Sequence, residues 1–203
     1  MKKLHARMEV LLLFLLVGLC LITGREREWL YILPAALIHE GGHYLAALVC
    51  GVHVKGIRLD LLGARMEISG LLSYGREFFV AMGGPLMNLL SVAVTHFLMK
   101  TGVIPFGNGG TLFMYASAGL GLLNLLPVGT MDGGRMLTSA IAGIFSPECA
   151  RICLGITTML CLFGLWSLSA YALLRGAPLL SVFVFSFSLI LRYASPDGVR
   201  REV

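Results

Sequence analysis

Charged residues are scarce in this chain. Of its 203 residues, 13% are charged and 57% are hydrophobic, whereas a soluble domain carries about 25% charged residues. The chain also lacks a C-x-x-C pair and a disulfide framework. Its five cysteines lie in or beside apolar segments and are expected to pack as small apolar side chains, although the i, i+4 spacing of Cys149 and Cys153 also suits a metal ion. We therefore expect an integral membrane protein.

The net charge of +5 does not indicate nucleic-acid binding, because the basic residues are scattered among loops rather than gathered on one face. Charge at the membrane borders explains them better. The chain is long enough for one membrane domain, and we expect residues 1–203 to form it without a second globular module.

Apolar blocks between charged or Gly/Pro-rich segments predict an all-α polytopic fold with six membrane spans, each near the roughly 20 residues that a bilayer needs. The spans cover approximately 8–23, 30–52, 77–99, 110–127, 150–174 and 178–193. The first block resembles a secretory signal, but no small-x-small cleavage site follows it, so we expect it to be retained.

The basic residues predict the orientation of these spans. Six spans place both termini on one side, together with segments 53–76 and 128–151. That side holds 12 of the 16 Lys and Arg residues, and the other side holds 4. The positive-inside rule therefore predicts cytoplasmic N- and C-termini.

A short β-hairpin is expected between the second and third spans. Polar and apolar residues alternate over Val54–Leu61 and again over Met66–Ser69, with a turn signal at 62–65. Such a strand pair can bind an extended substrate at its open edge. A simple connecting hairpin fits the pattern equally well.

An H-E-x-x-H signature, formed by His39, Glu40 and His43, lies within the second apolar block. On a helix, residues four apart share a face, so both imidazoles can bind one metal ion while Glu40 stands close to a bound water. Ionisable residues within a membrane are costly, which makes them candidates for function.

A catalytic zinc site needs a third protein ligand besides two histidines. Asp132 is the acidic residue that stands out, because it follows the fourth span in a segment that Pro127 and several glycines interrupt. Such broken backbone at membrane depth must be surrounded by protein or line an aqueous cavity. We therefore expect Asp132 to point into the helix bundle.

Three motifs together resemble the site-2 protease family of intramembrane metalloproteases. They are H-E-G-G-H at 39–43, G-G-P-L-M-N at 83–88 and N-x-x-P-x-x-x-x-D-G-G at 124–134. The resemblance covers approximately residues 30–140. The small size and six predicted spans are most similar to the sporulation branch of that family, whose substrate is a sigma-factor precursor.

The resemblance implies a zinc-dependent intramembrane endopeptidase in a bacterial inner membrane. One Zn²⁺ ion would be held by His39, His43 and Asp132, with Glu40 as general base and Asn124 near the substrate. The substrate would be a membrane-bound or membrane-associated protein, cut near the cytoplasmic face. Many family members have a proline where this chain has Thr130, which affects the rigidity of that loop.

Two other functions fit the same residues. A membrane metal-ion transporter would use the ligands as a transient site and would not need Glu40. A non-catalytic membrane binding protein would be expected to lose a ligand or the base, and none is missing. Asn88 is interpreted as an interhelical hydrogen-bonding residue. The exact substrate, the oligomeric state and any regulatory membrane partner stay open.

Overall fold

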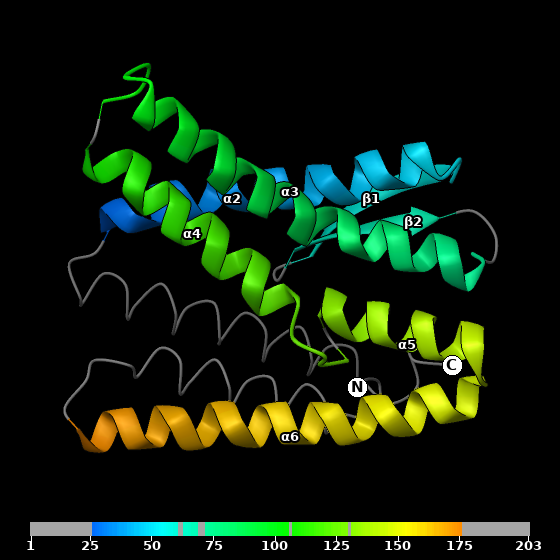
Figure 1. The fold of residues 1–203 in the computed structure, drawn as a ribbon. Helices are drawn as coiled ribbons and strands as arrows, with labels where there is room; N and C mark the ends of the chain where they lie inside the picture. Colours follow the sequence, from blue (N-terminus) through cyan, green and yellow to red (C-terminus); the bar gives the residue numbers. More distant parts are fainter. Residues whose placement is uncertain (1–25, 61–62, 69–71, 106, 130, 176–203) are drawn as a thin grey trace.

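The computed structural model describes residues 26–60, 63–68, 72–105, 107–129 and 131–175 (Figure 1). Its helices are α2 (Glu26–Val49), α3 (Tyr74–Lys100), α4 (Asn108–Asn124), α5 (Asp132–Ile144) and α6 (Pro147–Leu174). Its strands are β1 (Val54–Asp60) and β2 (Gly63–Ile68). The mostly helical fold predicted from the apolar blocks is confirmed.

Helix α2 is rich in Leu and Ala, which are good helix formers. It buries one face, whose residues recur at helical spacing: Ala35, His39, Gly42, His43 and Ala47. That face packs against α3, which lies beside α2 and also contacts α4 and α5 (Figure 1). The two histidines of the signature therefore point into the bundle.

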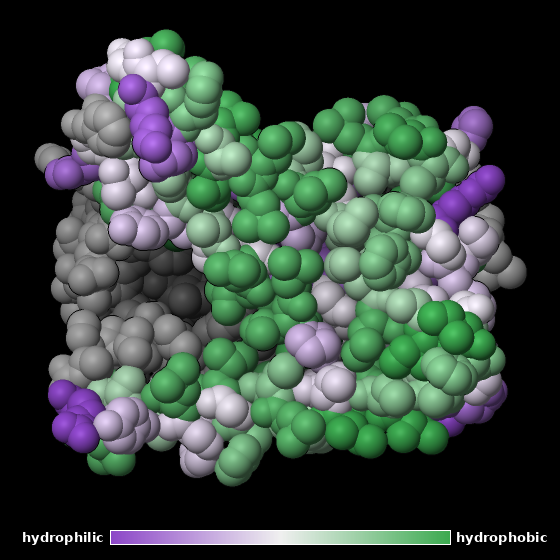
Figure 2. All heavy atoms as spheres, viewed as in Figure 1, coloured by the Kyte–Doolittle hydropathy of each residue, from purple (hydrophilic) through white to green (hydrophobic). Residues whose placement is uncertain are grey.

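Three of the described helices are long and apolar enough to cross a membrane. Their apolar stretches are Tyr31–Val49, Tyr74–Lys100 and Pro147–Leu174, and they overlap the predicted spans 30–52, 77–99 and 150–174. Figure 2 shows hydrophobic side chains over the middle of one face and hydrophilic ones gathered near its two ends, the pattern expected where lipid surrounds the protein.

The remaining predicted spans have different outcomes. Helix α4 overlaps the predicted span 110–127, but it has 17 residues and is not among the three candidate spans. The predicted spans 8–23 and 178–193 lie outside the described residues. The count of six spans therefore stays a prediction.

Strands β1 and β2 pair antiparallel in the segment between α2 and α3. Ile57 pairs with Met66, and Asp60 pairs with Gly63 at the end of the ladder. Residues 61–62, which join the strands, lie outside the described residues, so the turn of the predicted hairpin stays a prediction.

Helix α5 was not predicted, because segment 128–151 was interpreted as a connection between spans. The structure forms a helix of 13 residues there, and this helix packs against α3 and α6. Its length is below that of a span, and it begins with the polar residue Asp132 and two glycines. A search for long apolar runs therefore misses it.

Candidate metal centre

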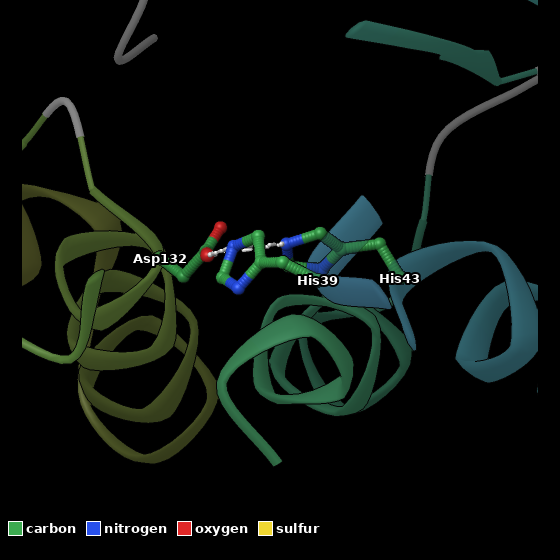
Figure 3. Close-up of side chains that lie close together, drawn as sticks. All are labelled: His39, His43 and Asp132. Atoms are coloured by element: carbon green, nitrogen blue, oxygen red, sulfur yellow. Dashed lines mark hydrogen bonds and ion pairs between the residues drawn. The ribbon is translucent and has the colours of Figure 1, made fainter. Parts of the chain in front are cut away.

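The structure brings His39, His43 and Asp132 together (Figure 3). The Nε2 atoms of His39 and His43 lie 3.0 and 3.1 Å from Oδ2 of Asp132. The two Nε2 atoms are 3.2 Å apart. All three side chains are buried, with 5%, 5% and 8% of each residue exposed. Three ligand atoms therefore converge on one point within the bundle.

This triangle fits a zinc ion. Ligands at tetrahedral angles and 2.0–2.1 Å from zinc stand about 3.3–3.4 Å from one another. The three edges observed here are 3.0, 3.1 and 3.2 Å, so small movements suffice to reach that spacing. Two imidazoles and one carboxylate also match the number of protein ligands in catalytic zinc sites.

The backbone of α3 determines the proton position on His43. Nδ1 of His43 lies 2.8 Å from the carbonyl oxygen of Val80. The backbone N–H of Gly84 lies farther from the same nitrogen, at 3.3 Å. A carbonyl oxygen can only accept a hydrogen bond, so in the shorter contact Nδ1 carries the proton and donates it to Val80. Nε2 then presents its lone pair toward Asp132, as metal coordination requires.

The side chain of Asn88 contacts the other histidine. Its Nδ2 lies 3.2 Å from Nδ1 of His39, and Asn88 is fully buried. Both histidines are therefore held from behind by α3, one through a backbone carbonyl and the other through an amide side chain. Such contacts orient metal-binding imidazoles.

Glycines allow the close approach of α2 and α3. A Cβ atom on Gly42 would lie 2.3 Å from the carbonyl oxygen of Gly83. A Cβ on Gly84 would lie 2.3 Å from Nε2 of His43 and 2.8 Å from Cε1 of His39. Gly42 and Gly83 thus allow the helices to touch, and Gly84 leaves room for the rings.

Asp132 is the first residue of α5, outside the three candidate spans. Burial on its own raises the pKa of its carboxyl group, yet the two imidazoles beside it lower this pKa to about 2. The carboxylate is therefore ionised at neutral pH. An ionised carboxylate beside two ring nitrogens favours a bound cation.

The loop before α5 wraps tightly around two glycines. A Cβ on Gly133 would lie 2.1 Å from the carbonyl oxygen of Leu125, and one on Gly134 would lie 2.2 Å from that of Val128. The backbone N–H of Gly129 donates to Oγ1 of Thr158 on α6, at 3.1 Å. These contacts set where α5 begins and thus where Asp132 lies.

The other predicted site residues lie as follows. Glu40 follows His39 on α2 and is half-buried. The amide nitrogen of Asn124 donates to the carbonyl oxygen of Leu120 in its own helix, at 3.0 Å, so the structure does not bring it into the triangle. Thr130 lies outside the described residues.

Sequence reasoning missed two contributions from α3 and underestimated a third. Val80, Gly84 and Asn88 all contact the histidine pair, and they are spaced four apart, as the histidines are. Two helices with matching four-residue spacing therefore face one another across the site. The prediction that Asn88 forms an interhelical hydrogen bond is confirmed, and the structure adds that its partner is His39.

Arg135 adds a longer-range charge contact. Its Nη1 lies 3.8 Å from Oδ1 of Asp132, and its Nε lies 3.9 Å from Oε1 of Glu77 on α3. Arg135 and Glu77 are both more than one-third exposed, so solvent screens this ion pair. The contact links α5 to α3 at the side of the site.

No family model matches the chain, but comparison with known proteins finds both sequence relatives and solved structures that are similar to it. Stage IV sporulation protein FB of Bacillus subtilis is 29% identical over 177 residues, covering 85% of this chain and 61% of that protein. A protein of Synechocystis sp., named as a candidate zinc metalloprotease, is 34% identical over 122 residues, covering 55% of this chain and 30% of that protein. The site-2 protease of Methanocaldococcus jannaschii matches with a TM-score of 0.60 and 21% identity, over 96% of this chain and 87% of that chain.

These similarities define the class of protein: a membrane protein with the fold of a site-2 protease. The resemblance predicted from the three motifs is therefore confirmed. At the level of individual proteins, stage IV sporulation protein FB is similar along most of this chain, which spans about three fifths of that relative's length.

Proposed function

We propose that this chain is a zinc-dependent intramembrane endopeptidase. The observation that carries the proposal is the buried triangle of His39, His43 and Asp132, whose edges are 3.0–3.2 Å. One zinc ion held there would supply a Lewis acid that polarises the scissile carbonyl and acidifies water. The name of the Synechocystis relative, a candidate zinc metalloprotease, supports this chemistry.

Glu40 is proposed as the general base. It is adjacent to His39 on α2 and half-buried, whereas both rings are buried. In this role it would take a proton from the attacking water and pass it to the leaving amine nitrogen. Because a helix shields its own peptide bonds, the substrate must unwind near the cut.

The substrate is proposed to be a membrane-bound or membrane-associated protein, cut near the cytoplasmic face. The similarity to a sporulation protein favours a sigma-factor precursor. Asn124 is proposed to contact the substrate backbone, and an open edge of β1 or β2 to pair with an extended segment. Six spans and cytoplasmic termini in a bacterial inner membrane complete the proposal.

Reconstitution of the chain with a membrane-tethered sigma-factor precursor tests the activity. We expect Glu40→Gln to lower the cleavage rate by at least about a hundredfold, because a positioned general base contributes 10²–10⁴-fold. Its zinc content should equal that of the wild type, since Glu40 is not a ligand. Asp132→Ala should lose both zinc and cleavage.

Glu148→Gln is the matched control, because it makes the same change at an exposed position in the first turn of α6. It should cleave at the wild-type rate. Undiminished cleavage by Glu40→Gln would overturn the assigned mechanism. Zinc flux into liposomes that does not depend on Glu40 would instead favour a transporter.

A further inference from the structure

We infer that Asn88 is a positioning residue that supports the metal-binding tautomer of His39 by accepting a hydrogen bond from Nδ1 through its amide oxygen. The inference rests on the proposed zinc site. It assigns to the G-G-P-x-x-N segment of α3 a role in metal binding beyond helix packing.

The first support is the position of the amide. Asn88 Nδ2 lies 3.2 Å from Nδ1 of His39, on the side of the ring opposite to Asp132. Asn88 is 0% exposed. Among the residues that the structure describes, its Oδ1 has no hydrogen-bond partner. A buried amide oxygen without a partner is costly.

The second support is the chemistry of the imidazole. In the arrangement described, the Asn88 amide donates to Nδ1, so the ring proton is on Nε2 and points at Asp132. A metal ion needs the lone pair of Nε2, and the neutral ring must then carry its proton on Nδ1. An amide N–H₂ group cannot accept that proton, whereas the amide oxygen can.

A half-turn of the Asn88 amide meets this requirement. The two ends of an amide have nearly the same shape, so the turn needs little extra space. Oδ1 then accepts from Nδ1–H of His39, which gives the buried oxygen its partner. The ring keeps one proton, which has moved from Nε2 to Nδ1.

The contrast with His43 explains why an amide is used here. The Val80 carbonyl can only accept, so this short contact favours the metal-binding tautomer of His43. Asn88 can donate or accept, so it satisfies His39 both with and without the ion. When the site is free of metal, Nε2–H can then bond to Asp132, so the carboxylate is not left facing two lone pairs.

A packing role alone is the competing explanation. A Cβ atom on Gly121 of α4 would lie 3.2 Å from Cβ of Asn88, so Asn88 also fills space between α3 and α4. Substitution of Asn88 by leucine or by aspartate distinguishes packing from hydrogen bonding. Leucine has a similar size but accepts no hydrogen bond, whereas aspartate accepts through either carboxylate oxygen.

Zinc affinity measured by competition with a chromophoric chelator tests the inference, using the full chain in detergent. We expect Asn88→Leu to bind zinc about 10–100-fold more weakly, the usual effect of losing such a supporting contact. Asn88→Asp should bind at least as tightly as the wild type, because a carboxylate is the stronger acceptor. Thermal unfolding of each metal-free variant records packing separately.

Ser117→Ala is the matched control, because Ser117 is fully buried on α4 and its Oγ has no partner among the described residues. Its zinc affinity should equal that of the wild type. A wild-type chain that binds no zinc refutes the proposed metal site itself. Wild-type zinc binding with an equally tight Asn88→Leu refutes only the role of Asn88.

Asn88→Asp decides the question if the leucine variant does not fold. An affinity more than about tenfold below wild type would show that accepting the Nδ1 proton is not what matters. An equal or tighter affinity, together with a lower unfolding temperature of the metal-free variant, supports the inference, because packing alone predicts no such separation.

Discussion

The histidine half of the metal centre lies on two long helices, whereas the aspartate half depends on a loop. On α2, Gly42 touches Gly83 of α3 so closely that neither helix can shift at this point without disturbing its other contacts. Asp132 instead follows a non-helical loop, whose Gly129 N–H donates to Thr158 of α6. A substitution that adds a Cβ atom should therefore destabilise the protein more in the helix pair than in the loop.

The largest loss of stability is expected for a substitution at Gly42. In Gly42→Ala the new Cβ meets the Gly83 carbonyl oxygen at 2.3 Å, so the helices must separate at the level of the histidines. We expect a loss of about 3 kcal/mol in stability, the upper end of the usual cost of overpacking. Zinc binding should be lost with it, as measured by thermal unfolding and metal content.

The neighbouring glycine is a matched control. A Cβ on Gly41 meets nothing within 4 Å, and alanine favours a helix by about 1 kcal/mol over glycine. Gly41→Ala should therefore fold with equal or greater stability and retain zinc. Similar destabilisation by both substitutions would show that helix–helix contact at Gly42 is not the cause.

Much of the histidine half could be predicted from the sequence, because it depends on local geometry. The four-residue spacing of His39 and His43 places them on one face of any helix. The contacts of Val80 and Gly84 could not be predicted in the same way. They depend on how α2 and α3 cross, which involves residues 37 or more positions apart.

A smaller loss of stability is expected for a substitution at Gly133, next to Asp132. In Gly133→Ala the new Cβ meets the Leu125 carbonyl oxygen at 2.1 Å, but the loop can move away from it. We expect zinc affinity to fall roughly tenfold, within the 1–3 kcal/mol typical of overpacking. Overall stability should fall less than in Gly42→Ala, as thermal unfolding without metal would show.

Gly143→Ala tests whether the position within α5 matters. A Cβ there makes only ordinary contact, at 3.5 Å from Cβ of Tyr74, so zinc affinity should not change. If Gly133→Ala destabilises the protein more than Gly42→Ala does, the loop that precedes Asp132 is more rigid than the contact between α2 and α3.

The aspartate half shows where sequence reasoning stops. Asp132 was predicted as the third ligand from its motif, and the structure brings it within 3.0 Å of a histidine 93 residues away. Helix α5, which begins at Asp132, was not predicted, because a short helix that starts with two glycines gives no long apolar run. Its residues do alternate as in an amphipathic helix, but the helices against which it packs, α3 and α6, are determined by the overall fold and not by this local pattern.

The smallest loss of stability and zinc affinity is expected at Thr158, which binds the loop before α5. Thr158→Val keeps the shape of the fully buried side chain but leaves the Gly129 N–H without its acceptor. We expect a loss of about 1 kcal/mol, and hence a few-fold weaker zinc binding. Thr157→Val is the control, because its Oγ1 donates only within α6, to the Leu154 carbonyl. If the loop is the adaptable half, Thr158→Val should weaken zinc binding while Thr157→Val leaves it unchanged. Equal zinc affinity in both would mean that the wrap around Gly133 and Gly134 suffices to place Asp132.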